Sequence, residues 1–444
     1  MKKFLAILIL IPALTFAQAR RASKQNVIAF TNVTIIDATG APPQPDMTVV
    51  VRGNRIVQRE KTAGHQLPRA AHIISCKGKF LIPGLWDMHG HLTNATETAF
   101  PLMIMNGVTG VRDMGGDLKQ IDRWRAEILT GRRLGPHIIR AGPFVDGPKP
   151  GVPNRLTVTN PAEGRRAVDE LKARGVDFIK VHNGLSRESF FAVADEARKV
   201  ALPLAVHLPS GLWTLPKGDG VSIAEASDAG AASIEHIEIL QESALYARGH
   251  TAKTEEDAYA ENFGPAGTEL FAKFVRNQTW YVPTLVAYYK GFVLWGDDQK
   301  EIAERRKDLA NLIALTGAMH NAGVQVMAGS DFSDWAIVPG VDLHNELGLL
   351  VEAGFSPMEA LQAATIKPAE FLRQADSLGT IEKGKIADMV LLTANPLEDI
   401  SHTRMIDSVV LNGRLIPVAK MLKLLTTSSM PSTKSHASGK RSAN

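Results

Sequence analysis

Two histidines separated by a single residue form the strongest chemical signal in the sequence. His89 and His91 stand in the segment PGLWDMHGH, residues 83–91, which continues an apolar run typical of a β-strand. Alternate residues of a strand point to the same face, so the imidazoles would lie about 6.6 Å apart along it. Gly90 leaves space between them for another group to approach. Such a pair suits a metal such as zinc, although two surface histidines would give the same pattern.

Three more polar residues end separate apolar segments. His207 ends LAVH, His236 ends SIEH, and Asp331 follows VMAGS. In a barrel of parallel strands, the side chains at the carboxyl ends converge on one face. A single histidine in such a place is more often a residue of the core. Several such residues on independent strands, together with the histidine pair, favour a metal site.

Lys180 lies inside an apolar strand, in the segment VDFIKVH at residues 176–182. Burying an ammonium group is costly, and burial lowers the pKa of a lysine, which frees the amine as a nucleophile. Three interpretations follow: an ion pair with Asp331 or Glu235, a Schiff base, or a carbamate formed with carbon dioxide. With four histidines nearby, we favour the carbamate, because it is an anionic ligand able to bridge two metals.

The elements that must position these residues alternate between strands and helices. Short apolar strands are expected at residues 178–181, 204–207, 233–236, 282–285 and 324–328. Amphipathic helices lie between them, and the capping box SPME at 356–359 opens one of the last. This alternation predicts an α/β fold, a (β/α)8 TIM barrel over residues 81–379. A doubly wound open sheet is the alternative, but no glycine-rich phosphate loop follows an early strand.

Both ends of the chain are rich in β-branched residues. The runs Val27–Ile36 and Thr48–Val57 near the start resemble Asp407–Ile416 near the end, and Gly53–Asn54 and Asn412–Gly413 predict hairpins. We expect the two terminal segments, residues 25–80 and 380–418, to pair into one small β-sandwich domain beside the barrel.

Residues 1–19 have the pattern of a secretory signal peptide: two lysines, an apolar stretch and the cleavage-type sequence AQA. The apolar stretch is too short to span a bilayer comfortably, so no stable membrane span is expected after its removal. The expected location is periplasmic or secreted, and an uncleaved anchor is the alternative. Cys76 is the single cysteine, which excludes an internal disulfide. Residues 420–444 are predicted to be a disordered basic tail.

The composition is that of a globular protein, with 45% hydrophobic and 22% charged residues. The formal net charge is +4, but residues 1–19 and 420–444 hold seven basic and no acidic side chains. Residues 20–419 therefore carry a net charge of −3. This balance gives no support to a nucleic-acid partner, so a small-molecule substrate is expected. Assembly into a homo-oligomer is left open.

In combination, these segments resemble the amidohydrolase superfamily of metal-dependent hydrolases, in its imidazolonepropionase-like and Xaa-Pro or Xaa-Arg dipeptidase-like branch. The matching segments are PGLWDMHGHL at 83–92, GVTGVRDMGG at 107–116, GVDFIKVHNGLS at 175–186, AVHLP at 205–209, ASIEHIE at 232–238, MAGSDF at 327–332 and GTIEKGKIADMVLL at 379–392. Together they span nearly all of residues 27–418. The resemblance implies a (β/α)8 barrel with a β-sandwich built from both termini.

The resemblance also implies a role for each candidate residue. The implied ligands are His89, His91 and Asp331 for the more buried metal, His207 and His236 for the second, and Lys180 as the carboxylated bridge. Relatives with one metal lack this lysine, so its presence implies two divalent metal ions, with zinc expected. His182 departs from the branch, in which a tyrosine is common at this position. It either contacts the substrate or merely closes the barrel mouth.

The predicted activity is hydrolysis of an amide-type bond in a dipeptide or an N-acyl amino acid, since the branch includes such enzymes. A metal-bridging hydroxide would attack, and Asp331 would serve as general base and then as general acid. Loop residues Lys149, Arg155, Trp213 and Lys217 are candidates for substrate contacts. The alternatives are hydrolysis of a cyclic amide, lactone or ester, including xenobiotics, and a non-catalytic scaffold on the same fold.

Overall fold

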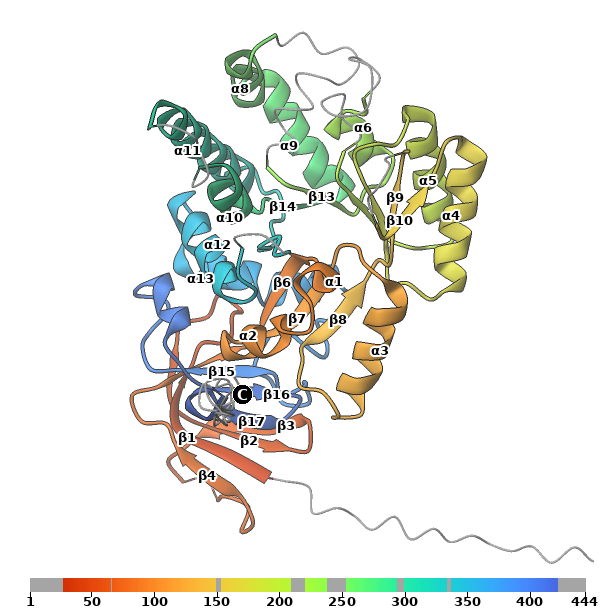
Figure 1. Cartoon of the computed structure of the whole chain (residues 1–444). Helices are drawn as coiled ribbons and strands as arrows, with labels where there is room; N and C mark the ends of the chain where they lie inside the picture. Colours follow the sequence, from red (N-terminus) through yellow and green to blue (C-terminus); the bar gives the residue numbers. More distant parts are fainter. Residues whose placement is uncertain are drawn as a thin grey trace, which may run out of the picture.

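Segments from both ends of the described chain form one eight-stranded sheet, drawn in red and blue in Figure 1. The computed structural model describes residues 27–64, 66–148, 153–208, 220–237, 253–293, 299–333 and 337–421. The strand order is β17-β16-β15-β5-β1-β2-β3, and β4 lies beside β1. The strands of this terminal sheet are β1 (Val27–Ile35), β2 (Gln44–Arg52), β3 (Arg55–Lys61), β4 (His72–Ser75), β5 (Phe80–Pro83), β15 (Met389–Leu392), β16 (Ile406–Leu411) and β17 (Arg414–Pro417).

Two tight hairpins form where the sequence predicts them. Arg52 pairs with Arg55 across Gly53–Asn54, and Leu411 pairs with Arg414 across Asn412–Gly413. In the second turn both central residues have positive φ, 49° and 75°, a backbone conformation that Asn and Gly tolerate best. The turn residues therefore fix the register of the flanking strands.

Strand β5 joins the two ends of the chain. It pairs in parallel with β1 and antiparallel with β15, through residues from Phe80 to Pro83. The sheet also curls so that β3 meets the segment before β15. The backbone N–H of Ile56 in β3 donates to the carbonyl of Lys385 at 3.0 Å. Apolar residues of both segments, such as Phe30 and Met389, share one buried cluster. The predicted pairing of the termini thus takes the form of one continuous curled sheet.

The middle of the chain forms two sheets of parallel strands, rather than one continuous eight-stranded ring. The first has the order β6-β7-β8 and the second β10-β9-β11-β12-β13-β14. Their bounds are β6 (Leu85–Gly90), β7 (Val108–Asp113), β8 (His137–Arg140), β9 (Phe144–Asp146), β10 (Arg155–Thr157), β11 (Ile179–Val181), β12 (Leu204–Val206), β13 (Ser233–Glu235) and β14 (Trp280–Val282).

Backbone hydrogen bonds cross the gaps between these sheets. The N–H of Asp177, before β11, donates to Arg140 of β8 at 2.9 Å, and the N–H of Met88 in β6 donates to Ala328 at 3.0 Å. Parallel bridges pair Gly90 with Phe332 and Tyr281 with Val326. Residues 324–332 therefore run between β14 and β6, in the position of a further strand.

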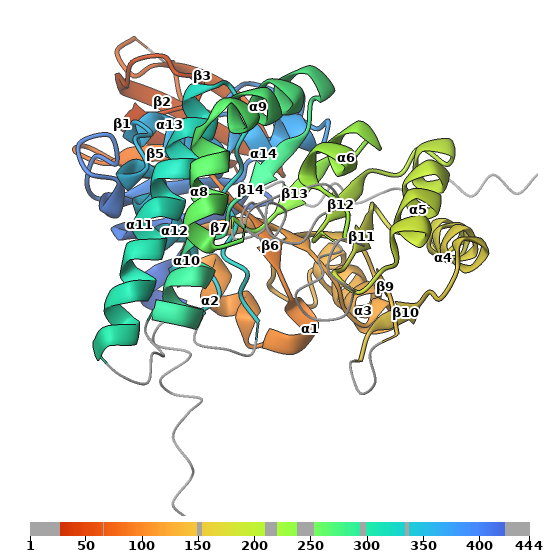
Figure 2. The ribbon, with the colours of Figure 1, turned by 90° about the horizontal axis from the view of Figure 1, so that it is seen from above.

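Helices surround these parallel strands on the outside, as the view from above shows (Figure 2). Their bounds are α1 (Leu92–Ala95), α2 (Ala99–Met105), α3 (Leu118–Leu129), α4 (Pro161–Ala173), α5 (Arg187–Lys199), α6 (Ile223–Asp228), α8 (Glu255–Phe263), α9 (Pro265–Asn277), α10 (Leu285–Tyr288), α11 (Gln299–Asn321), α12 (Val341–Glu352), α13 (Pro357–Ala363) and α14 (Ile366–Phe371), with a π-turn at Tyr289–Val293 and a 3-10 turn at Ile400–Arg404. The predicted capping box is confirmed: Ser356 and Glu359 cap α13 reciprocally, and Pro357 takes its first position.

Among the described residues, no helix is long and apolar enough to cross a bilayer. The predicted signal peptide, residues 1–19, lies outside the described residues, and so does nearly all of the predicted basic tail. Apolar side chains of the parallel strands and of the surrounding helices form one large buried cluster. This packing holds the strand ends that carry the predicted ligands.

Candidate metal centre

His89, His91 and Asp331 meet at the carboxyl end of β6. His89 is the second-last residue of the strand and is fully buried, and His91 is the first residue after the strand. Asp331 is held beside them because its backbone N–H donates to the carbonyl of His89 at 2.8 Å. Its Oδ1 lies 3.4 Å from Nε2 of His89 and 3.2 Å from Nε2 of His91. One ligand atom of each residue falls within 4.8 Å of the other two, a spacing that suits one divalent metal ion.

His236 and His207 extend this cluster towards β12. The ring of His236 lies 4.5 Å from that of His89 and 4.7 Å from that of His207, measured between centroids. Oδ2 of Asp331 lies 3.9 Å from Nδ1 of His236, whereas Oδ1 faces the other two histidines. The carboxylate thus stands between two groups of imidazoles.

Lys180 is the central residue of β11 and pairs in register with Ala205 of β12. Its side chain is 1% exposed, and among the described residues Nζ has no hydrogen-bond partner. Burial lowers the pKa of the amine to about 8, and the nearby charges of Glu235, Arg112 and Asp331 modify that effect. The Lys180 charge in turn helps to lower the pKa values of His207 and His236, so these groups share one electrostatic environment. The ion pairs considered for Lys180 from the sequence do not form.

The protonation states fit a metal-binding role. Burial lowers the pKa values of His89, His207 and His236 well below the usual value, which keeps these imidazoles neutral, the form that binds metals. Burial alone would raise the pKa of Asp331, but its electrostatic interactions with His89 and His91 and a hydrogen bond from His91 outweigh it. The pKa of Asp331 therefore lies below its usual value, and the group is a carboxylate. Nε2 of His89 is buried and has no hydrogen-bond partner within the described parts of the chain, as expected of a nitrogen that faces a metal.

The backbone is strained where it presents these ligands. His236 and Asp331 adopt φ values of 71° and 57°, and Thr284 adopts 48°. Positive φ is costly for residues with a β-carbon, and most so for a β-branched threonine. Thr284 makes a hydrogen bond of 2.9 Å through Oγ1 with Nδ1 of His236. Strain of this kind persists at functional sites because the surrounding structure holds it in place.

Gly90 has the role expected of it, since another group packs against its α-carbon. A β-carbon at this position would lie 2.2 Å from the ring of Phe332. Phe332 follows Asp331 and pairs with Gly90 across the bridge between the sheets. The glycine therefore allows the segment that carries Asp331 to approach His89 and His91.

Three buried charged residues lie around the ligands. The sequence pointed to Glu235 only as a possible partner of Lys180, and it did not identify Arg112 or Asp87. Glu235 contacts His89 and Arg112, and Asp87 accepts hydrogen bonds from the backbone N–H and the hydroxyl of Ser330, at 2.9 and 2.6 Å. Each of these charged residues lies inside an apolar strand. That placement is the signal that points to them, since an isolated charge in a buried strand needs a partner.

His182 lies beside the second group of imidazoles. Its ring is 4.6 Å from that of His207 and 5.2 Å from that of Phe144, and its side chain is 22% exposed. Nδ1 of His182 is 3.3 Å from Oδ2 of the buried Asp146. Arg155, considered for substrate contacts from the sequence, forms an ion pair with Asp146 instead. The other loop candidates, Lys149, Trp213 and Lys217, lie outside the described residues.

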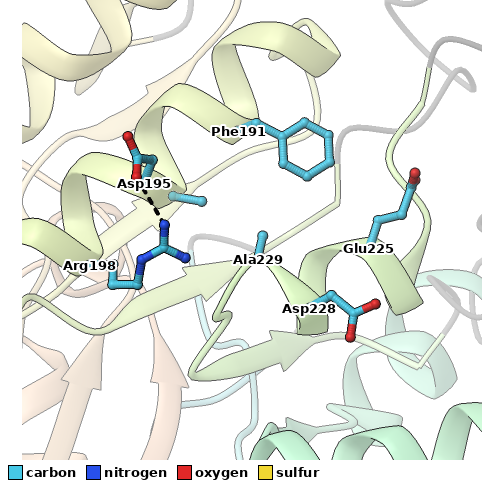
Figure 3. Close-up of a pocket in the computed structure, with 7 residues that line it drawn as sticks. Phe191, Asp195, Arg198, Glu225, Asp228 and Ala229 are labelled. Atoms are coloured by element: carbon cyan, nitrogen blue, oxygen red, sulfur yellow. Dashed lines mark hydrogen bonds and ion pairs between the residues drawn. The ribbon is translucent and has the colours of Figure 1, made fainter.

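A separate hollow of about 380 Å³ lies between α5 and α6, on the outside of the parallel strands (Figure 3). Phe191, Asp195 and Arg198 of α5 face Glu225 and Asp228 of α6 across it. Arg198 donates a hydrogen bond of 2.9 Å to Asp195. None of the predicted ligands lines this hollow.

The match to known families agrees with this geometry. Residues 80–416, which include both parallel sheets and most of the C-terminal strands, match the amidohydrolase family. The chain therefore belongs to the amidohydrolase family, whose members are metal-dependent hydrolases of carbon–nitrogen bonds.

Individual relatives cover different shares of the chain. A candidate prolidase from Bifidobacterium longum is similar in structure, with a TM-score of 0.71 and 25% identity over 91% of this chain and 99% of that one. Ochratoxinase from Aspergillus niger is 26% identical over 384 residues, which cover 72% of this chain and 71% of that protein. Adenine deaminase from Rubrobacter xylanophilus is 22% identical over 375 residues, 82% of this chain. The chain spans only 54% of that deaminase's length.

Proposed function

We propose that the chain is an exported hydrolase that uses two divalent metal ions, expected to be zinc, to cleave an amide-type bond in a dipeptide or N-acyl amino acid. The observation that carries the proposal is the buried amine of Lys180, which has no hydrogen-bond partner among the described residues and interacts electrostatically with four histidines and Asp331. The structural likeness to a candidate prolidase supports the dipeptide class.

Lys180 would act as an anionic bridge after reaction with carbon dioxide. The neutral amine adds to the carbon of carbon dioxide and loses a proton, which gives a carbamate with two ligand oxygens. Because burial lowers the pKa of this amine to about 8, an appreciable fraction is neutral near physiological pH. A carbamate would also relieve the cost of a buried ammonium, since its charge would be balanced by the cations that it binds.

Asp331 and His182 would have different roles in hydrolysis. Two bound cations would supply an activated water molecule and polarise the scissile carbonyl. The Asp331 carboxylate, whose side chain is 25% exposed, would take the proton from that water and deliver it to the leaving nitrogen. His182, at the open side of the second histidine group, would contact the substrate. No serine or cysteine nucleophile is required.

Two further parts of the proposal concern the architecture and the location. We take the two parallel sheets, together with residues 324–328, as a closed (β/α)8 barrel, which the hydrogen bonds across their gaps support. We also take residues 1–19 as a signal peptide that directs the protein to the periplasm or beyond, which their basic and apolar pattern supports.

A second candidate keeps the same metal chemistry but acts on a xenobiotic amide, a cyclic amide, a lactone or an ester. The match to ochratoxinase favours this second candidate, because the aligned region covers similar shares of the two chains, 72% of this one and 71% of ochratoxinase. The scaffold alternative is less favoured, since all six predicted ligands are present.

Metal analysis combined with a substrate panel tests the proposal. The purified protein, loaded with zinc, cobalt or manganese, is assayed on dipeptides, N-acyl amino acids, lactones and esters. We expect about two metals per chain and hydrolysis of the first two classes. The variant Asp331→Asn should lose activity by orders of magnitude and retain much of its metal. Two bound metals without hydrolysis of any class would favour the scaffold, and near-normal turnover of Asp331→Asn would remove that residue from its role.

A further inference from the structure

A buried ion pair lies directly behind His89. Arg112 of β7 contacts Glu235 of β13 through one guanidinium nitrogen, which is 2.8 Å from each carboxylate oxygen. Both side chains are at most 1% exposed. Oε2 of Glu235 also lies 2.9 Å from Nδ1 of His89. The carboxylate thus connects the arginine to a predicted metal ligand, at a depth that solvent does not reach.

Further hydrogen bonds and aromatic contacts hold the guanidinium of Arg112 in place. Its Nε donates to the carbonyl of Met88 at 2.7 Å, and a terminal nitrogen donates to the hydroxyl of Ser233 at 2.9 Å. The rings of Phe178 and Phe371 lie 5.6 and 5.2 Å from its central carbon. Arg112 therefore ties β6 to β13, the strands that carry His89 and Glu235, while aromatic faces contact the cation.

The hydrogen bond to Glu235 has one consistent direction. A carboxylate paired with a guanidinium accepts hydrogen bonds, so Nδ1 of His89 must donate. A neutral imidazole that donates through Nδ1 leaves the lone pair of Nε2 free. Nε2 is the atom that faces Asp331, and no residue that the structure describes makes a hydrogen bond with it.

We propose that Arg112 and Glu235 are positioning residues of the metal centre, which hold His89 in the one tautomer and orientation that can bind a cation. The inference rests on the proposed metal-dependent function. It goes beyond that function by assigning a role to two residues outside the predicted ligand set. Partners of this kind typically change metal affinity by 10–100-fold when they are removed.

Metal affinity, measured by competition with a chelator for cobalt, tests this role without recourse to activity. We expect Glu235→Leu and Arg112→Met each to weaken cobalt binding by about 10–100-fold. Glu235→Gln keeps one carbonyl oxygen that accepts from Nδ1, so its affinity should lie between those of the wild type and Glu235→Leu. The absorption spectrum of bound cobalt should change in the same order, because it reports the geometry of the ligands.

A matched control separates positioning from general stability. Arg59→Met breaks the ion pair of 2.5 Å between Arg59 in β3 of the terminal sheet and Asp37, which follows β1; neither residue belongs to the sheets that carry the histidines. It should lower the melting temperature and leave cobalt affinity unchanged. The inference is wrong if Arg112→Met and Glu235→Leu bind cobalt within threefold of the wild type, or lose no more affinity than Arg59→Met.

Two further outcomes are decided by the same series. If Arg112→Met and Glu235→Leu fail to fold, Glu235→Gln decides, and wild-type affinity and spectrum in that variant overturn the inference. A wild-type protein that binds cobalt but hydrolyses nothing would contradict the proposed function alone. The variants would still show whether Arg112 and Glu235 position His89.

Discussion

Replacing Lys180 by methionine should raise the stability of the metal-free protein. Burial lowers the pKa of the amine from 10.5 to about 8, and each pKa unit corresponds to about 1.4 kcal/mol. Keeping the ammonium inside the fold at pH 7 therefore costs about 3 kcal/mol. Methionine has a similar length and no charge, so Lys180→Met should recover up to about 3 kcal/mol in the free energy of unfolding.

The pH dependence of the free energy of unfolding is a second test of whether the buried ammonium destabilises the fold. The folded-state pKa lies below the unfolded value, so the unfolded state binds more protons between about pH 8 and pH 10.5. The stability of the metal-free wild type should gain from this group as the pH rises through that window. Lys180→Met lacks this contribution, and its advantage over the wild type should shrink towards pH 10.5.

With metals bound, the same substitution should act in the opposite direction. The variant lacks the proposed bridging carbamate, so metal content should fall from two towards one per chain, and activity should be lost. In the smaller variant Lys180→Ala, added acetate or propionate would supply a carboxylate in place of the carbamate and restore part of both. Denaturant unfolding with a chelator present and metal analysis without it measure the two effects separately.

Two results would refute this reasoning. A metal-free Lys180→Met that is less stable than the wild type at pH 7 would mean that the ammonium is favourably solvated or paired in the fold. A variant that retains two metals per chain and normal turnover would mean that Lys180 does not bridge them.

Two other predictions concern histidines outside the predicted ligand set. His182→Leu should raise KM by roughly tenfold with a smaller change in kcat, as expected for a lost hydrogen bond to bound substrate; steady-state kinetics with an unchanged KM would place His182 outside the substrate site. His137→Gln removes the 2.8 Å contact with Asp388, a contact that outweighs burial and raises the pKa of His137. Because the folded pKa is raised, this stabilisation is complete below about pH 6.5 and is lost as the pH rises through the folded pKa. The melting temperatures of variant and wild type should therefore differ most near pH 5.5 and converge at alkaline pH, and a constant difference would contradict the assignment.

Local sequence signals were sufficient where the structure depends on neighbouring residues. Asn412–Gly413 forms the predicted hairpin, and Ser356 forms the predicted cap, because each depends on side chains and φ values within a few residues. The spacing of His89 and His91 likewise placed two imidazoles together at a strand end. The amidohydrolase family was recognisable because these local segments occur in a fixed order along the chain.

Features that depend on distant residues could not be predicted in this way. Arg112 and Glu235 are 123 residues apart, and no periodicity indicates that they meet behind His89. The strands β11 to β14 have only three residues each, too few for an alternation pattern to show which side chains face inward. His236 faces the cluster through a positive φ, which an ideal strand would not predict.

Because the terminal sheet contains strands from both ends of the chain, it cannot be completed until the C-terminal strands have been synthesised. β5 pairs on one side with β1, made early, but its other partner β15 ends at Leu392, 309 residues after Pro83. At 5–20 residues per second, β5 waits about 15–60 s for that partner to emerge. Until then its unpaired edge is open to other nascent chains, so a chaperone that covers extended segments would raise the yield more than one that acts on the finished protein.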